Sequence, residues 1–217
     1  MVSRFRKDDS GASMVEFTLV FPMILLVTLG TVDATLMLYD WACANKAAYR
    51  GARMAVISAP VATGITTFAY DTNPTHMGDL CFSTDNGQAS VDVACPTVTT
   101  RCTFSAKTCS GGQIRDAAAT TRILGEMQRI FPRLTADNVE VEYRTNGLGF
   151  YGRPGGLPMD VTVRIRCMSS QFFFLGALMG WAFPALPAGC PAGAGAVTGP
   201  ALPAFSSTLP SEGMGAS

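Results

Sequence analysis

The hydrophobic pattern of the chain is dominated by one long apolar run near the N-terminus. This run follows Gly11, contains a single early acid at Glu16, is free of charge from Phe17 to Val32, and reaches a second acid at Asp33. As a helix the uncharged part spans roughly 24 Å, short of the ~30 Å hydrocarbon core, but the apolar flanks extend it to Tyr39. The sequence therefore predicts a helix that can cross a bilayer, with one acid near each end.

The same helix is predicted to continue to about Ser58, because Pro60 follows. Small side chains recur on this continuation at four-residue intervals, in two adjacent rows. Such rows let a neighbouring helix approach closely, although the high helix propensity of alanine would also explain them. We expect a helix-packing surface formed by Ala44, Ala47, Ala48, Gly51, Ala52 and Ala55.

Three later segments show the periods of regular secondary structure. Apolar residues recur every three or four positions from Ile114 to Phe131, which predicts an amphipathic helix ended by Pro132. Asn138–Arg144 and Met159–Cys167 alternate apolar and polar residues, and the glycine-rich loop between them predicts an antiparallel pair of strands. The buried face expected for the helix is Ile114, Ala117, Thr121, Leu124, Met127 and Phe131. Further candidate strands are Val91–Val93 and Thr97–Thr100.

Two segments near the C-terminus lack such a period. Phe172 to Phe183 is apolar but too short and too interrupted by glycine to span a membrane. We expect it to form core beneath the sheet; the alternative is an exposed apolar patch that meets a partner subunit or the bilayer surface. Residues 184–217 consist mainly of Pro, Ala, Gly and Ser, which predicts a loosely ordered tail.

Composition and cysteine content narrow the class of protein. Only 15% of residues are charged and 48% are hydrophobic, which is typical of a single-span protein, and the zero net charge gives no reason to expect nucleic acid binding. An even number of cysteines beyond the span predicts up to three disulfides. These cysteines are Cys81, Cys95, Cys102, Cys109, Cys167 and Cys190, and we expect Cys167 to pair with Cys190. Cys43, on the helix, is expected to be a small packing residue.

The predicted fold class is therefore α+β. A long N-terminal helix is followed by a small disulfide-containing domain with an antiparallel sheet and a second amphipathic helix. Zinc is the alternative use of the cysteines, but the chain has no C-x-x-C pair and a single histidine, so we expect no metal and no cofactor.

Catalytic motifs are absent from the sequence. His76 lies in a turn-like segment between Asp71 and Asp79, with no nucleophile at a recognisable spacing. The chain has no P-loop, no H-E-x-x-H and no nucleophile elbow. We expect no enzymatic activity; a membrane-tethered hydrolase would require the His76 segment to fold against a nucleophile.

The residues before the apolar run resemble a known processing signal. The small residues Ser10-Gly11-Ala12-Ser13 precede the apolar core, whereas a secretory signal places them after it. Gly11 followed five residues later by Glu16 resembles the class III signal of type IV prepilins. That resemblance implies cleavage between Gly11 and Ala12. Glu16 would then pair with the new ammonium group, on its own chain or on a neighbouring subunit, and set the register of assembly.

Further features narrow the resemblance to one family. These features are Leu29, Gly30, Asp33, Tyr39, Ala47-Ala48 and Arg50-Gly51-Ala52-Arg53. In them the chain resembles the TadE-like family, the minor pilin-like or pseudopilin proteins of tight-adherence (Flp) pilus systems. The resemblance implies a role in assembling a Tad/Flp-type pilus for adhesion or secretion. Implied partners are the membrane, other pilin-like subunits, the pilus assembly machinery and a prepilin peptidase. Glu16 and Asp33 are the residues expected to set subunit register.

The resemblance also implies a location and a domain organisation. The chain would lie in the bacterial inner membrane, with its N-terminus in the cytoplasm and its C-terminal domain in the periplasm, or in an extracellular pilus after assembly. We expect a leader at 1–11, the helix at 12–58, a periplasmic α+β domain at 59–183 and the tail at 184–217. The alternative is an uncleaved single-pass periplasmic scaffold or binding protein.

Overall fold

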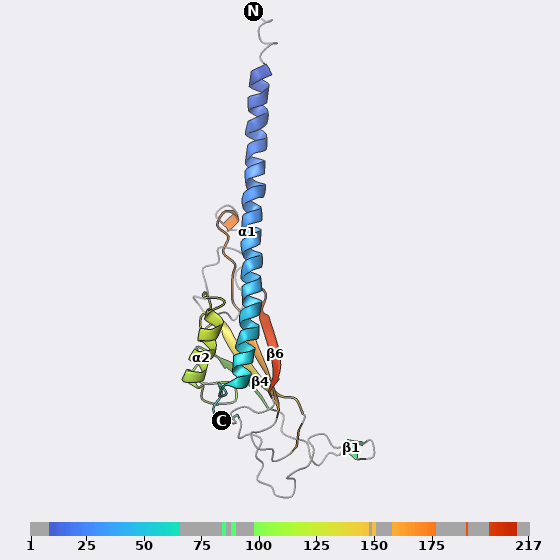
Figure 1. Ribbon diagram of the computed structural model, residues 1–217, viewed down its shortest axis with the longest axis vertical. Helices are drawn as coiled ribbons and strands as arrows, with labels where there is room; N and C mark the ends of the chain where they lie inside the picture. The colour runs from blue at the N-terminus through green and yellow to red at the C-terminus, as the bar shows by residue number, and fades with distance from the viewer. Residues whose placement is uncertain are drawn as a thin grey trace, which may run out of the picture.

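The computed structural model describes residues 9–65, 84–85, 88–89, 98–147, 149–150, 158–176, 190 and 200–211. In this part of the chain the fold is α+β, as predicted. One long helix, α1, projects from a small domain that contains a sheet and a second helix, α2 (Figure 1). The N-terminal part of α1 stands clear of the domain and its C-terminal part packs against the sheet.

Helix α1 runs from Asp9 to Ile57, 49 residues, and includes Pro22. Its two halves differ in burial. Large apolar side chains between Met14 and Val32 are exposed, whereas one face of the helix is buried from Cys43 onward. The predicted end near Ser58 is confirmed to within one residue.

The domain is built on a four-stranded antiparallel sheet in the order β3-β4-β5-β6. The inner strands β4 (Val139–Thr145) and β5 (Met159–Ile165) are the predicted pair, with Tyr143 opposite Val161. Strand β3 (Thr99–Thr103) lies slightly later than the predicted segment Thr97–Thr100. A separate pair, β1 (Thr84–Asp85) and β2 (Gln88–Ala89), is also antiparallel. The candidate strand Val91–Val93 lies outside the described residues.

The fourth strand corrects the prediction of a loosely ordered tail. Strand β6, Phe205–Ser211, pairs with β5 along its whole length. It is held by the buried side chains of Leu202 and Phe205. The ring of Phe205 packs edge-on against the ring of Trp41 of α1, with 6.3 Å between the ring centroids. An edge strand needs a backbone partner on one side only, so it tolerates Pro210, which has no N–H to donate. The composition of the tail concealed this strand.

Helix α2 runs from Ala117 to Gln128, a shorter segment than predicted. The preceding residues Ile114 and Arg115 form β-bridges, so the helix begins only after Asp116, whose carboxylate accepts hydrogen bonds from two backbone N–H groups of the first turn. The predicted buried face is wrong in its first part, where Ala117 and Thr121 are exposed, and correct at Met127 and Phe131, which are buried. Ile114 is 65% exposed. The buried residues of α2 are Ala119, Thr120, Ile123 and Met127.

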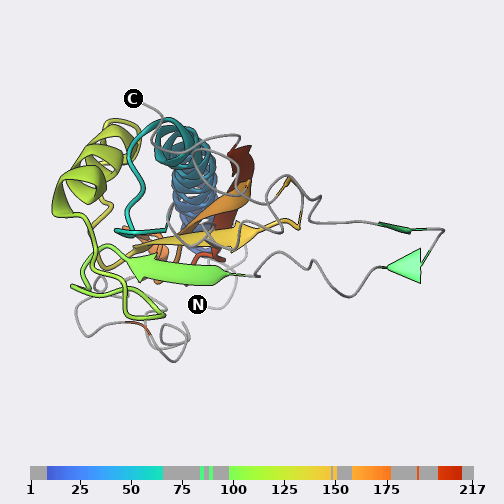
Figure 2. The same cartoon turned by 90° about the horizontal axis from the view of Figure 1, so that it is seen from below.

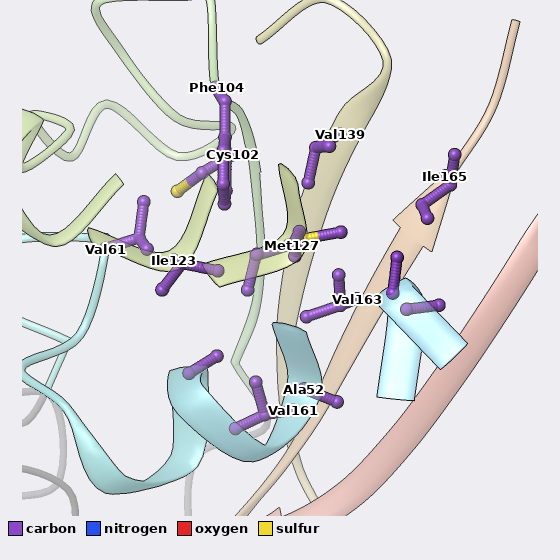
Figure 3. Close-up of a cluster of buried hydrophobic side chains, with 14 of the residues drawn as sticks. Ala52, Val61, Cys102, Phe104, Ile123, Met127, Val139, Val161, Val163 and Ile165 are labelled. Atoms are coloured by element: carbon purple, nitrogen blue, oxygen red, sulfur yellow. The ribbon is translucent and has the colours of Figure 1, made fainter. Parts of the chain in front are cut away.

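The core lies between the sheet and the two helices. Figure 2 shows α1 and α2 on the same side of the sheet, and Figure 3 shows Ala52 of α1 and Met127 of α2 among the valines of β4 and β5. Tyr143 of β4 is fully buried, and its hydroxyl oxygen accepts a hydrogen bond of 2.9 Å from the backbone N–H of Val61. Burial raises the pKa of Tyr143 to about 12.

The other face of the sheet carries ion pairs rather than apolar side chains. Glu142 lies between Arg101 at 2.9 Å and Arg164 at 3.1 Å, and Glu140 pairs with Arg166 at 2.8 Å. The arginines cover both carboxylates, so Glu140 and Glu142 are nearly buried although they point away from the core.

Candidate functional site

The small side chains of α1 form a packing surface, but within their own chain. Ala44, Ala47, Ala48, Ala52 and Ala55 are buried in the domain core. At Gly51, a Cβ atom would lie 2.6 Å from Sδ of Met127, so α2 approaches α1 as closely as a glycine allows. These residues pack against α2 and the sheet. The fold itself therefore occupies the small-residue rows, and α2 is the helix that approaches them within the same chain.

The N-terminal half of α1 carries a long exposed apolar surface. A helical window here has a mean hydropathy of 2.0, which makes the helix long and apolar enough to cross a membrane. Exposed side chains on this part are Met14, Val15, Phe17, Leu19, Val20, Phe21, Met23, Ile24, Leu25, Leu26, Val27 and Val32. Glu16 is also exposed, and no other charged residue occurs before Asp33 in this segment.

The predicted processing site lies at the start of the helix. Gly11 and Ala12 follow the first residue of α1, Asp9, and their backbone is helical. Cleavage after Gly11 and the pairing of Glu16 with the Ala12 ammonium group stay predictions.

Asp33 makes contacts that the sequence did not predict. Its side chain is fully buried, and its carboxylate accepts hydrogen bonds from the backbone N–H groups of Phe173 at 3.1 Å, Phe174 at 3.1 Å and Leu175 at 2.7 Å. We call these three bonds the Asp33 contact. The carboxylate thus joins α1 to a segment about 140 residues later in the chain. These bonds occupy the Asp33 carboxylate within its own chain, and a role of Asp33 in subunit register stays a prediction.

The segment held by Asp33 is the beginning of the apolar stretch Phe172–Phe183. Core packing was predicted for it, but Phe173 is 65% exposed and Phe174 is 46% exposed, so that prediction is wrong for the described residues. The exposed-patch alternative holds there. Figure 1 shows this segment, residues 172–176, rising from the domain alongside α1 (small orange element). We refer to it as the 172–176 loop.

The 172–176 loop and α1 enclose an apolar groove of about 540 Å³. Leu175 lies over Gly30, where a Cβ atom would be 3.7 Å from its side chain. The lining residues are Pro22, Leu25, Leu26, Leu29, Phe173, Phe174 and Leu175. We call this feature the apolar groove.

The sequence carried one signal for the Asp33 contact. A carboxylate next to an apolar run has a high desolvation cost unless polar groups form hydrogen bonds with it, so Asp33 needed a partner. Nothing local identified that partner, because backbone N–H groups at 173–175 have no side-chain signature.

Four of the cysteines form disulfides. Disulfides join Cys102 to Cys109 and Cys167 to Cys190, the latter being the expected pair. Cys43 is free and buried. Cys81, Cys95 and His76 lie outside the described residues. Within the described ranges, no group of three or more His, Cys, Asp or Glu side chains is arranged to hold a metal ion.

These observations define a class of protein: a small α+β domain carried on an apolar helix long enough for membrane anchoring. Residues 11–53 match the family model of TadE-like proteins, which confirms the resemblance over about a fifth of the chain. The matched segment includes Gly11, Glu16, Asp33 and most of the small-residue rows, and it indicates a pilus-associated protein. Searches among curated proteins and among solved structures found no match.

Proposed function

We propose that this chain is a pilin-like subunit, a TadE-like pseudopilin, that acts in the assembly of a Tad/Flp-type pilus used for adhesion or secretion. The family match to residues 11–53 carries the proposal, because it includes both Gly11 and Glu16. In this proposal a prepilin peptidase cleaves after Gly11. The helix then holds the chain in the inner membrane with the domain in the periplasm. The proposal assigns no catalytic role.

Association of apolar helices is the proposed mechanism. Since the small-residue rows are buried in the domain, contacts between subunits fall on the exposed half of α1 between Met14 and Val32. Exposed helix surface of this length lies in lipid until a neighbouring helix covers it. Glu16 gives this otherwise uniform surface one specific partner, the ammonium group of Ala12 on a neighbouring processed subunit, and so fixes the axial register.

The mature N-terminus provides the decisive measurement. The full chain is purified from cells that have an active prepilin peptidase, and its N-terminus is determined by mass spectrometry. A chain that begins at Ala12 supports the proposal. A chain that begins at Met1 contradicts it and favours the uncleaved single-pass scaffold or binding protein.

A substitution tests the role of Glu16 separately from processing. Glu16→Ala should leave membrane insertion intact and abolish pilus assembly, because the helix keeps its apolar length and loses its specific partner. Thr18→Ala is the matched control: Thr18 lies in the same exposed turn and its hydroxyl donates only to the carbonyl of Val15. Normal pilus output from Glu16→Ala, or an equal loss in Thr18→Ala, would count against the proposed role.

A further inference from the structure

The 172–176 loop lies beside the part of α1 that carries no charge. The helix residues that line the apolar groove, Pro22 to Leu29, precede Asp33 by four to eleven positions. At 1.5 Å per residue these positions lie about 6 to 17 Å from Asp33 along the helix axis, toward the centre of the apolar run. If α1 crosses a bilayer, the loop therefore lies at the depth of the hydrocarbon rather than in water.

A loop at that depth must satisfy its backbone polar groups within the protein. The Asp33 contact does this for three consecutive N–H groups, those of Phe173, Phe174 and Leu175. The bonds also satisfy the carboxylate of Asp33, which is fully buried and directly follows the charge-free run. Each partner thus offsets the desolvation cost of the other, an arrangement that an aqueous loop would not need.

The outward surface of the loop is apolar and continuous with the exposed surface of α1. Phe173 and Phe174 present their rings beside Leu25 and Leu26, and no charged side chain lines the groove. A surface of this kind offers no hydrogen-bonding or ionic partner to a polar ligand. Acyl chains fit it, because they already cover the adjoining surface of the membrane-length helix.

We infer that the 172–176 loop is a second membrane-contacting element, inserted into the leaflet nearer the domain, with lipid acyl chains filling the apolar groove. The inference rests on membrane anchoring by α1 and does not depend on processing or pilus assembly. The consequence of this second contact is that the domain has a defined position against the membrane. A domain attached both at α1 and at this loop is fixed in height and rotation against the membrane surface, whereas a single helix would leave it free to swivel.

Depth-dependent quenching of tryptophan fluorescence tests the inference on the full chain in lipid nanodiscs. Both native tryptophans are first removed as Trp41→Phe and Trp181→Phe. In this background Phe174→Trp reports the loop, and Leu26→Trp reports the helix surface that lines the same groove. Ile114→Trp is the control, because Ile114 is an exposed apolar residue on the domain.

With lipids brominated along their acyl chains, we expect Phe174→Trp and Leu26→Trp to be quenched to a similar extent and Ile114→Trp to stay bright. Adding Asp33→Ala should release the loop, so that quenching of Phe174→Trp falls while quenching of Leu26→Trp persists. Should Asp33→Ala fail to fold, the comparison of the three reporters with Asp33 intact still decides the question. A bright Phe174→Trp beside a quenched Leu26→Trp would overturn the inference.

A photoreactive side chain at Phe173 distinguishes lipid from protein in the groove. Crosslinks in native membranes to phospholipid support the inference. Crosslinks predominantly to a second copy of the chain or to another protein overturn it and make the groove a helix-docking site. Neither outcome alters the mass of the mature N-terminus, so failure here is distinguishable from failure of the proposed function.

Discussion

Arg133 and Asp40 form an ion pair of 2.7 Å between side chains that are 93 residues apart in sequence. A second guanidinium nitrogen of Arg133 donates to the backbone carbonyl of Ser169 at 2.8 Å. One side chain thereby joins α1, the segment after α2, and the segment that leads from β5 to the 172–176 loop. It lies on the domain side of the Asp33 contact, and it fixes the base of the loop against the helix.

Arg133→Ala should lower the free energy of unfolding by about 1–3 kcal/mol, because it removes two charge-assisted hydrogen bonds. The Asp40 carboxylate and the Ser169 carbonyl, which are both partly shielded from water, each lose this partner. Arg133→Lys should recover only part of the loss, since an ammonium group lacks the planar fork that reaches both acceptors. The measurement is denaturant unfolding of the full chain in detergent. Arg129→Ala is the control: Arg129 is 76% exposed in its pair with Glu126, and its removal should cost under about 0.5 kcal/mol. Equal losses at the two arginines would contradict the assignment.

Two glycines should respond in opposite directions to the same substitution. Gly51→Ala places a Cβ atom 2.6 Å from Sδ of the buried Met127, so overpacking of about 1–3 kcal/mol outweighs the gain in helix propensity. Gly125 lies in α2 with nothing within 4 Å of its added Cβ, so Gly125→Ala should stabilise by about 0.5–1 kcal/mol. Thermal unfolding of the two variants checks the sign. Stabilisation by Gly51→Ala would show that Met127 moves aside at little cost.

The elements predicted correctly are those whose pattern is local. The span of α1 and the strands β4 and β5 follow from residues within each segment, because burial on one or both faces sets the hydrophobic period. Helix α2 was placed correctly, but the first part of its predicted buried face was wrong. Its start depends on the bridge from Arg115 to the distant Ala62 and on the bridge from Ile114 to the nearby Thr108, and the Asp116 cap was not recognised. Strand β6 was missed because pairing with β5, rather than its own composition, makes it a strand.

The same distinction applies to the candidate site. Gly11 and Glu16 were singled out from local sequence, and the family match covers both. The small-residue rows were recognised as a contact surface, but sequence spacing does not say whether the partner belongs to the same chain. Asp33 shows the limit most clearly, since its partners are backbone groups about 140 residues later in the chain. Local pattern identifies which residues need a partner, and the tertiary fold supplies it.

The two disulfides should differ in their contribution to stability. In the chain-entropy model a disulfide stabilises more when it closes a longer loop. Cys167 and Cys190 are 23 residues apart, and Cys102 and Cys109 are 7 apart, so replacing each pair with serines should cost about 3 and about 2 kcal/mol respectively. Unfolding of the two paired variants under non-reducing conditions measures the difference. A larger loss for the shorter loop would show that native packing, rather than loop closure, dominates.

Alkaline pH should unfold the domain through Tyr143. Its pKa is raised to about 12 by burial, against 10.0 for an unperturbed tyrosine, so the folded state favours the neutral hydroxyl. A raised pKa in the folded state means that the stabilisation is fully present below pH 10 and is lost as the pH rises through 12. The difference of about two units corresponds to roughly 3 kcal/mol.

Tyr143→Phe should therefore weaken the fall in stability over this window. At neutral pH the same variant should be less stable by about 1–3 kcal/mol, because the buried N–H of Val61 loses its acceptor. Tyr49→Phe, which removes an exposed hydroxyl, should keep the wild-type pH dependence. Unfolding curves of the three proteins between pH 8 and 12 check this, and an equally steep fall in Tyr143→Phe would assign the alkaline transition to other groups.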